Sequence, residues 1–341
     1  MTSEEPTLTI AISNYNHSRF LPAMLDSLLI QSYQPLELLL VDDASTDDSA
    51  RILRDYAQRH PVIELTLNER NRGAVANYVD LLNRARGRYF MGVAADDVIL
   101  PGFLEKSMAI LREHPSAGLC SCLSRLIDKD GRDLGLFFPN PFPSVRSAHY
   151  IDPQEVSRRF LKRGPWIEGN TAIYRTEALI AAGGFRPDLR SFADGFVMQV
   201  IALTHGVCFV PEPLAAWRRM PEGFSGKTIA TPSIACELAD RAAHFMETEY
   251  RPLFSPQYVK KWRSRWDCSF LVAFSEVKER EWLAGVRLLL DHRGSSSGIR
   301  GILTLAIGSV AKFAKGLAAV RFRWFDLGWY IRDRIRGSTR P

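Results

Sequence analysis

Apolar runs and amphipathic stretches alternate along the first 126 residues of the chain. The runs have the length of buried strands, whereas the stretches between them repeat apolar residues every three or four positions, as helices do. The expected strands are Leu8–Ser13, Glu37–Asp42, Val62–Leu67, Tyr89–Val93 and Gly118–Leu126. The expected helices are Arg19–Gln31, Thr46–His60 capped by Ser45, Ala74–Arg86, and Pro101–His114 with proline at its first position. This alternation predicts an α/β fold with a mostly parallel sheet that is covered on both faces.

The pattern is interrupted between Asp128 and Tyr150, where proline, glycine and charged residues predict a loop excursion or a mobile lid. Periodicity then returns. The expected elements are the helices Asp152–Arg163, Thr176–Ala182 and Ala193–His205 and the strands Gly169–Tyr174 and Val207–Val210. Beyond Pro232 the chain is predicted to be helical to its end, apart from a Ser/Gly linker at Gly294–Gly298.

The composition is that of a globular protein, because 46% of the 341 residues are hydrophobic and 24% are charged. No apolar stretch reaches the roughly 18 residues of a membrane span, and no leader-like segment precedes the first strand, so we expect a cytoplasmic protein. The five cysteines lack zinc-ligand spacing and are interpreted as reduced, buried thiols.

Polar side chains gather where three predicted strands end. Ser13–Asn16 follows the first strand, Asp42 and Asp43 end the second, and Asp96 and Asp97 follow the fourth. In open α/β sheets, ligands bind beyond the carboxyl ends of the strands. A pair of carboxylates there suits Mg²⁺ or Mn²⁺, which prefer oxygen ligands and complete their shell with water and phosphates. The alternative for Asp96 and Asp97 is a solvated turn before a helix N-terminus, where negative charge is favoured.

Three segments taken together resemble the family 2 glycosyltransferases, which are inverting enzymes of the GT-A fold. These segments are Thr9–Asn16, Leu38–Asp47 and Tyr89–Leu100, and the resemblance covers roughly residues 7 to 220. It implies a GT-A domain over residues 1–230, with a nucleotide-sugar half at 1–126 and an acceptor half at 127–230. Residues 231–341 then form a helical C-terminal region.

The resemblance also implies roles for the residues at the strand ends. Ser13 and Tyr15 would lie against the base and ribose of a nucleotide-sugar, and Asp43 would accept the uracil imide hydrogen. Asp96 would face the ribose. Asp97 would ligate the Mn²⁺ or Mg²⁺ that neutralises the departing diphosphate.

The sequence departs from the family pattern at two positions. The family usually has Asp-x-Asp-Asp where this chain has Ala94-Ala95-Asp96-Asp97, and Ala76 stands where many members have an arginine. Arg72 is a candidate to supply that cation to the diphosphate or base. A solvated loop arginine is the alternative interpretation.

The acceptor half contains the predicted general base. In the alignment with the family, Asp194 removes the proton of the acceptor hydroxyl. The alternative is a helix N-cap, and the two roles are compatible. Trp166 and Glu168 are predicted acceptor contacts, with core packing and a surface acid as their alternatives. Arg218, after the final strand, is a weaker candidate for contact with the diphosphate.

The C-terminal tail accounts for the net charge of +6, because residues 310–341 contain eight Lys and Arg and two Asp. Apolar residues recur there at helical spacing beside these cations, which suits the surface of an anionic membrane or packing on protein. Nucleic acid is not an expected partner. The membrane interpretation would place the enzyme on the inner face of the cytoplasmic membrane, near lipid-linked acceptors.

The sequence and this resemblance therefore predict an inverting glycosyltransferase that moves a sugar from a nucleotide donor, with a UDP-sugar favoured, to a hydroxyl of a glycan or lipid-linked acceptor in cell-surface polysaccharide synthesis. The alternative is a catalytically inactive glycosyltransferase-like binding or scaffold protein. A signalling receiver domain is disfavoured because its acidic pair follows the first strand, whereas Asp42 and Asp43 follow the second.

Overall fold

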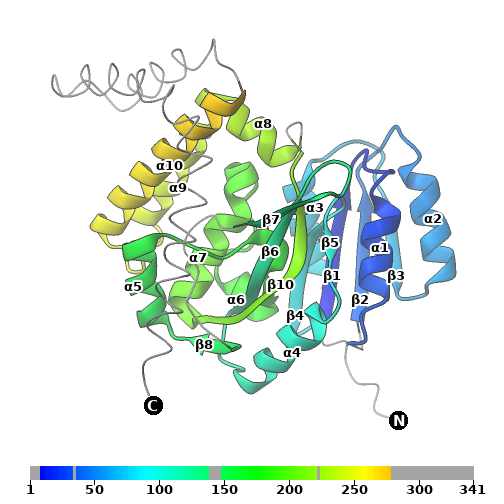
Figure 1. Cartoon of the computed structure of the whole chain (residues 1–341), viewed down its shortest axis with the longest axis horizontal. Coiled ribbons are helices and arrows are strands. Elements are labelled where there is room, and N and C mark those ends of the chain that lie inside the picture. Colours follow the sequence, from blue (N-terminus) through cyan, green and yellow to red (C-terminus); the bar gives the residue numbers. More distant parts are fainter. Residues whose placement is uncertain (1–7, 34–35, 138–146, 221–222, 278–341) are drawn as a thin grey trace. The chain divides into compact units, whose positions relative to one another are not determined.

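A central sheet with helices on both faces forms the fold (Figure 1). The structure is a computed structural model that describes residues 8–33, 36–137, 147–220 and 223–277. The chain divides into two compact units, residues 1–266 and 267–341. The predicted division near residue 230 stays a prediction.

Ten strands form the sheet in the described part of the chain, and the order along the main path is β3-β2-β1-β4-β9-β6-β10-β5. The first-half strands are β1 (Leu8–Asn14), β2 (Leu36–Asp42), β3 (Ile63–Leu67), β4 (Tyr89–Ala94) and β5 (Val98–Ile99). The others are β6 (Leu119–Ile127), β7 (Asp133–Phe137), β8 (His149–Ile151), β9 (Ile173–Arg175) and β10 (Val207–Arg218). Strands β3, β2, β1 and β4 pair in parallel, as β6 and β10 do, but β9 is antiparallel to both of its neighbours. The sheet is therefore parallel in its first half and mixed in its second.

The helices follow the strands in the order that the sequence predicts. The first four are α1 (Leu21–Leu29), α2 (Ser49–Arg59), α3 (Ala74–Arg84) and α4 (Phe103–Glu113). The others are α5 (Pro153–Arg163), α6 (Thr176–Ala181), α7 (Ala193–His205), α8 (Phe224–Ala230), α9 (Pro232–Glu247) and α10 (Pro256–Val277), with short 3₁₀ turns at Gly169–Thr171 and Pro187–Phe192.

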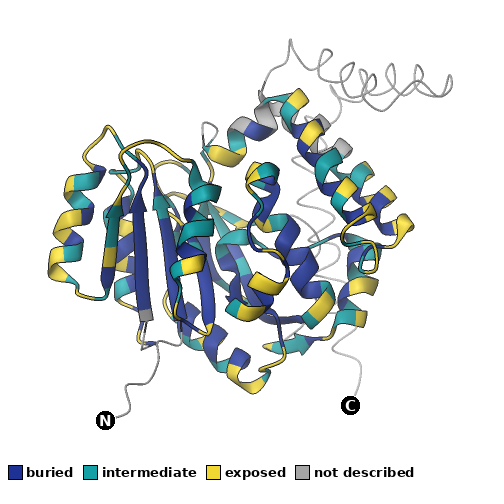
Figure 2. Cartoon of the chain, turned by 180° about the vertical axis from the view of Figure 1, so that it is seen from behind, coloured by how far each residue is buried: buried dark blue, intermediate teal, exposed yellow. Residues whose placement is uncertain are grey.

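Alternation along the strands divides the core into two layers. Ile10 and Met91 point to the face that α1 covers, where Met24 and Leu28 pack against them in one apolar cluster. Phe90 points to the opposite face, where its ring contacts Phe185. Because both faces are covered, β1 is buried at almost every position. Figure 2 shows the strands as the most buried part and the outer helix surfaces as exposed.

The predicted α/β class and the helical extension after the sheet are confirmed, and four local predictions are corrected. Ser45 does not cap a helix, because α2 begins at Ser49 with Asp48 at the N-cap position. Pro101 lies before α4 and is not its first residue. The N-cap residue of α4 is Gly102, whose backbone is in the left-handed conformation. The final strand runs to Arg218 rather than to Val210. The predicted strand at Gly169–Tyr174 begins as a 3₁₀ turn.

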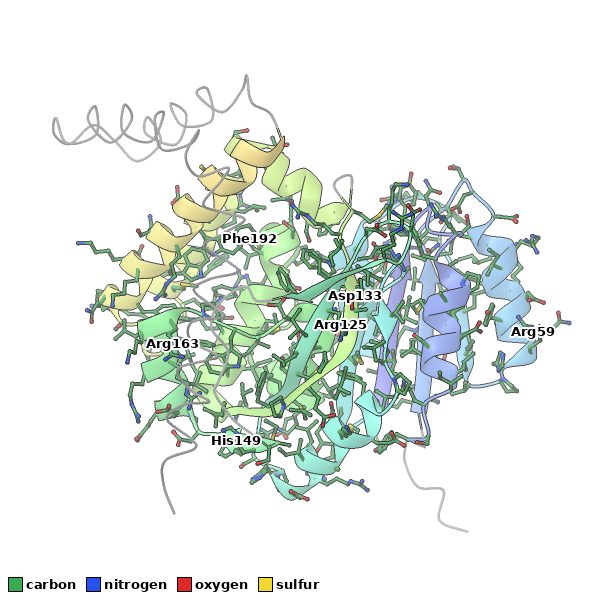
Figure 3. The ribbon with its side chains drawn as sticks, in the orientation of Figure 1. Arg59, Arg125, Asp133, His149, Arg163 and Phe192 are labelled. Atoms are coloured by element: carbon green, nitrogen blue, oxygen red, sulfur yellow. The ribbon has the colours of Figure 1, made fainter. Side chains whose placement is uncertain are left out.

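The stretch between Asp128 and Tyr150 is not a loop throughout. Residues 133–137 form β7, which pairs antiparallel with β6, and β8 pairs with β10. Arg125 of β6 forms an ion pair with Asp133 of β7, and Figure 3 shows the two side by side. The predicted linker at 294–298 and the basic tail at 310–341 lie outside the described residues. None of the described helices has the length and hydropathy needed to cross a membrane.

Candidate active site

The carboxyl ends of β1, β2 and β4 meet at one edge of the sheet. The parallel register places Ser13 beside Ala94 and Asn14 beside Asp42. The side chain of Asn14 donates to Asp42 Oδ1 at 2.8 Å, and Ser45 Oγ donates to the same oxygen at 2.6 Å. Asp42 is thereby used to hold the turns after β1 and β2. Asp43, the next residue, takes no part in these hydrogen bonds and is available for another role.

Asp43 is almost completely buried, with 1% of its surface exposed. Its Oδ1 accepts hydrogen bonds from Asn68 Nδ2 (2.8 Å) and the Arg72 amide (2.9 Å), and its Oδ2 accepts from the Gly73 amide (2.8 Å). Burial acts to raise the pKa of this carboxyl, but the hydrogen bonds outweigh it and the pKa is lowered. Asp43 is thus an ionised acceptor, and Oδ2 still has capacity for one more donor.

A line of amides links Asp43 to the end of β1. Asn68 also donates to Asn77 Oδ1 at 3.0 Å, and Asn77 Nδ2 donates to Ser13 Oγ at 2.9 Å. Asn77 is buried at the start of α3. The two predicted donor-site residues, Ser13 and Asp43, are therefore held in one hydrogen-bonded unit.

The side chain of Tyr15 is available to a ligand, whereas the side chain of Arg72 is engaged with another residue of the protein. Tyr15 lies just beyond β1 with 45% of its surface exposed, so its ring face is open to stacking. Arg72 supports Asp43 through its backbone amide, whereas its guanidinium forms an ion pair with Asp80 of α3. In this arrangement the Arg72 side chain points along α3.

Asp97 lies in the turn after β4 and is 2% exposed. Its Oδ1 accepts a hydrogen bond from the Arg218 amide at 2.9 Å, and no described residue donates to Oδ2. Burial, together with the neighbouring charge of Asp96, raises the pKa of Asp97 well above its usual range. A carboxylate in this position favours a cation beside it.

Arg218 is buried at the end of β10 and connects three segments. Its Nε donates to the Asp96 carbonyl at 2.8 Å, and another guanidinium nitrogen donates to the Asp128 carbonyl at 2.9 Å. The guanidinium also lies 4.6 Å from the centroid of the Phe20 ring. The side chain predicted to contact a diphosphate is therefore occupied in holding the Asp96–Asp97 turn.

The described residues can hold a divalent metal only with help from a ligand. They contain no group of three His, Cys, Asp or Glu side chains placed to bind one ion. Asp96 and Asp97 remain as two hard oxygen ligands, and Ala94 supplies none. This donor set fits Mg²⁺ or Mn²⁺, which take one or two carboxylates and complete their shell with phosphate oxygens and water.

Tyr78 of α3 lies among the predicted catalytic carboxylates. Its hydroxyl donates to the Val93 carbonyl at 2.7 Å, at the end of β4. Burial raises the pKa of the Tyr78 phenol, and the charges of Asp97, Asp96 and Asp194 raise it further. The 3₁₀ turn at Gly169–Thr171 lies against Asp194 and also packs on β4, so the fold brings Asp194, which is about 100 residues away in sequence, toward the Asp96–Asp97 pair.

Asp194 is the second residue of α7, so it is not the N-cap. Its Oδ1 accepts a hydrogen bond from the Gly195 amide at 2.7 Å. Its Oδ2 lies against Gly169, where a Cβ atom would stand only 2.3 Å away. The side chain is open to solvent on one side, but the crowded protein atoms raise its pKa above the ordinary aspartate value. A carboxylate with a raised pKa is a stronger base, which suits proton removal from a hydroxyl.

Glu168 precedes the 3₁₀ turn that packs against Asp194, and the described residues give its carboxyl no hydrogen-bond partner. Burial, and next the charge of Asp194, raise the pKa of Glu168 to about 8. Trp166 is only 3% exposed and packs edge-to-face on Phe160 of α5 at 5.0 Å. The tryptophan ring therefore belongs to the core behind the acceptor segment, whereas Glu168 faces the same space as Asp194.

Sequence reasoning missed Asn68, Tyr78 and Gly169. The signals were weak, because an asparagine after a strand, an aromatic residue in a helix and a glycine before a strand are all common. Their roles come from contacts between segments that are distant along the chain.

The comparisons with known proteins agree with this arrangement. Residues 9–154 match the family model described as Glycosyl transferase family 2. A Bacillus subtilis protein named for teichuronic acid biosynthesis, the glycosyltransferase TuaG, is 31% identical over 141 residues, which is 41% of this chain and 56% of TuaG. The chain spans 72% of one uncharacterized mycobacterial relative and 60% of three others, at 28% or 29% identity.

Two solved structures share the fold at 19% identity. S. aureus TarS 1-349 in complex with UDP-GlcNAc has a TM-score of 0.63, covering 84% of this chain and 81% of that one. The mannosyltransferase PcManGT from Pyrobaculum calidifontis, in complex with GDP-Man and Mn²⁺, has a TM-score of 0.56 and covers 93% and 83%. The strand-end carboxylates, the sheet order and these likenesses lead to one conclusion: the chain is a glycosyltransferase with the GT-A fold, and its residues 9–154 are similar to family 2.

Proposed function

We propose that the protein is an inverting glycosyltransferase that takes a sugar from a nucleotide-sugar, with UDP as the favoured nucleotide, and transfers it to a hydroxyl of a cell-surface glycan or its lipid-linked precursor. The observation that supports this most is the convergence of Asp96, Asp97 and Asp194 around Tyr78, beside the Ser13–Asp43 unit. In this proposal, that arrangement puts the donor site next to the basic carboxylate.

On the donor side, the base stacks on Tyr15 and its imide N–H donates to Asp43 Oδ2. The lowered pKa of Asp43 keeps it an acceptor, which favours uracil or thymine over bases that present an acceptor at that point. Ser13, fixed by Asn77, lies against the ribose, which Asp96 faces from the other side. The donors in the two solved relatives, UDP-GlcNAc and GDP-Man, support a nucleotide-sugar but differ in their base.

Asp97 would hold Mn²⁺ or Mg²⁺ in the donor site. When bound, the ion neutralises the negative charge that develops on the departing nucleotide. The protein contributes a buried carboxylate whose orientation is fixed by the Arg218 amide. Removing that carboxylate should weaken donor binding as well as turnover.

On the acceptor side, Asp194 takes the proton from the attacking hydroxyl. The hydroxyl oxygen forms a bond to the anomeric carbon from the face opposite the diphosphate, and the bond from that carbon to phosphate oxygen breaks, with its electrons leaving on the nucleotide. One displacement of this kind inverts the anomeric configuration. Glu168 is placed to contact the acceptor, and at neutral pH its raised pKa lets it donate a hydrogen bond.

The direct test incubates the protein with UDP-, GDP- and dTDP-sugars and Mn²⁺ and follows the release of nucleoside diphosphate, with proton NMR of the sugar product. Inversion at the anomeric carbon, abolished in Asp194→Asn, is the expected result. Retention of configuration, or equal release by Asp194→Asn, would refute the assigned role. A folded wild type that releases nothing from any donor would favour the alternative, a binding or scaffold protein.

The basic tail at 310–341 remains the proposed contact with the inner face of the cytoplasmic membrane. The support is the sequence alone, through its excess of arginine and lysine beside apolar residues at helical spacing. Sedimentation with anionic liposomes, before and after deletion of the tail, tests this contact.

A further inference from the structure

A hollow of about 520 Å³ lies on the surface between the end of α9 and the start of α10. Phe254 and Val259 form its apolar floor, and each is 2% exposed. Arg251, Lys260 and Arg263 line it with positive charge, and Glu247 is its acidic residue. The volume is within the range of small-molecule sites, which is roughly 300–1,000 Å³.

Two of these cations are available to a ligand. Arg263 is already committed, because it bridges Asp240 (3.3 Å) and Glu247 (3.1 Å) and so fastens α10 to α9. Arg251 and Lys260 are exposed and form no ion pair with any described residue. The hollow therefore combines an apolar floor with two unpaired positive charges at its rim. Such a surface suits a sugar ring that carries a phosphate or carboxylate.

The hollow is connected to the acceptor side of the active site through packed side chains. The Phe254 ring contacts Phe196 of α7, at 6.4 Å between centroids, and Tyr250 contacts the same ring at 5.3 Å. Phe196 stands two residues after Asp194 on α7. The hollow thus lies one layer of side chains behind the helix that carries the proposed base, outside the site where the chemistry occurs.

Residues of α10 next to the hollow contact the acceptor segment. Tyr258 of α10 stacks on Phe160 of α5, and Phe160 contacts Trp166, two residues before Glu168. Arg265 and Lys261 donate to the carbonyl of Leu161, the residue after Phe160. Figure 3 shows Arg163 at the end of α5 on this side of the sheet. A ligand that reaches both the hollow and Asp194 must be an extended chain.

We infer that this hollow is a second binding site for the acceptor, and that the acceptor is an anionic glycan polymer with repeating phosphate or carboxylate groups. The inference rests on the proposed function. An anionic repeat unit contacts Arg251 and Lys260 in the hollow while a hydroxyl elsewhere on the same chain reaches Asp194.

The test measures fluorescence anisotropy of labelled polygalacturonate, glycerol-phosphate polymer and neutral dextran with the full chain. The variant is Arg251→Ala with Lys260→Ala. The matched control is Arg54→Ala with Arg112→Ala, which removes two exposed arginines from α2 and α4. We expect the wild type to bind at least one anionic polymer and not dextran, with the affinity falling as salt rises. The hollow variant should bind about a hundredfold more weakly, since each of the two lost charge-assisted contacts is worth on the order of a tenfold change, and the control should match the wild type.

Equal weakening in the control, an unchanged hollow variant, or no binding of either anionic polymer would overturn the inference. So would a hollow variant that loses binding only to phosphatidylglycerol vesicles, because the site would then recognise lipid. Calorimetric titration of the donor into the same variants distinguishes failure of this inference from failure of the proposed function. Donor binding does not involve Arg251 or Lys260, so it should be unchanged in the hollow variant. Thermal unfolding confirms that each variant is folded.

Discussion

The substitution Gly169→Ala should impair catalysis without harming the fold. A Cβ atom at position 169 would stand 2.3 Å from Asp194 Oδ2 and 3.4 Å from its Cγ. For ordinary van der Waals contact at 3.4 Å, the oxygen must retreat by about 1.1 Å. The atom in the way is the end of a flexible side chain, so the carboxylate moves and the backbone does not.

The expected effect on rate follows from this displacement. A misplacement of about 1 Å in a catalytic group can lower the rate roughly 10²-fold, and complete loss of a general base lowers it by roughly 10²–10⁴-fold. We therefore expect kcat to fall about 10²-fold while donor affinity stays unchanged. Stability should be equal or slightly higher, because alanine restricts the unfolded chain by about 0.4–1 kcal/mol relative to glycine.

The matched control is Gly195→Ala, next to Asp194 on α7. A Cβ atom at position 195 would meet no atom within 4 Å outside its chain neighbours, and alanine keeps the amide that donates to Asp194 Oδ1. Alanine is also preferred over glycine within a helix by about 1 kcal/mol. Steady-state transfer kinetics, donor calorimetry and thermal unfolding are measured for both variants. An unchanged kcat in Gly169→Ala, or equal losses in the two variants, would refute the assignment of Asp194 as the base.

Three further predictions concern the groups around the site. In Glu168→Gln, thermal unfolding between pH 4.5 and 8 should show a gain in stability over the wild type that grows with pH. The folded-state pKa of Glu168, about 8, lies above the unfolded value, so the wild type loses stability across this range as the carboxyl ionises. A pH-independent difference would argue against a buried carboxyl. The pH–rate profile should rise through a pKa above the ordinary aspartate value and lose this limb in Asp194→Asn, since the raised pKa of Asp194 governs the base form. Arg218→Met should destabilise the protein by about 2–6 kcal/mol in denaturant unfolding, because the buried carbonyls of Asp96 and Asp128 each lose a donor worth about 1–3 kcal/mol; a change below 1 kcal/mol would show that water replaces the guanidinium.

The elements with strong periodicity were predictable from the sequence, and those that depend on pairing were not. The strands of the first half are continuous apolar runs because both of their faces are buried, and this signal is local. Residues 133–137 lack such a run, and β7 exists because β6 offers it a partner. β10 continues past its predicted end at Val210, because register shifts around Pro213 let the pairing with β6 continue.

The candidate site shows the same division. The acidic residues were predictable from the sequence, and the residues that hold them in place were not. Asp43, Asp97 and Asp194 stood out as acids beside apolar segments, and the fold brings them to one region. What the sequence did not show is how each is fixed, because the Asn68 and Arg218 contacts join segments separated by 25 and 121 residues. Arg218 was expected to face the ligand, yet its burial turns it into a support for the Asp96–Asp97 turn.

The measurement that tests the central claim most directly is calorimetric titration of UDP-, GDP- and dTDP-sugars, with and without Mn²⁺, into the wild type, Asp97→Asn and Asp194→Asn. The account predicts that one donor binds in a metal-dependent way, that Asp97→Asn loses this binding, and that Asp194→Asn keeps it while losing transfer. Metal-independent binding that survives in Asp97→Asn, or the absence of binding by a folded wild type, would contradict it.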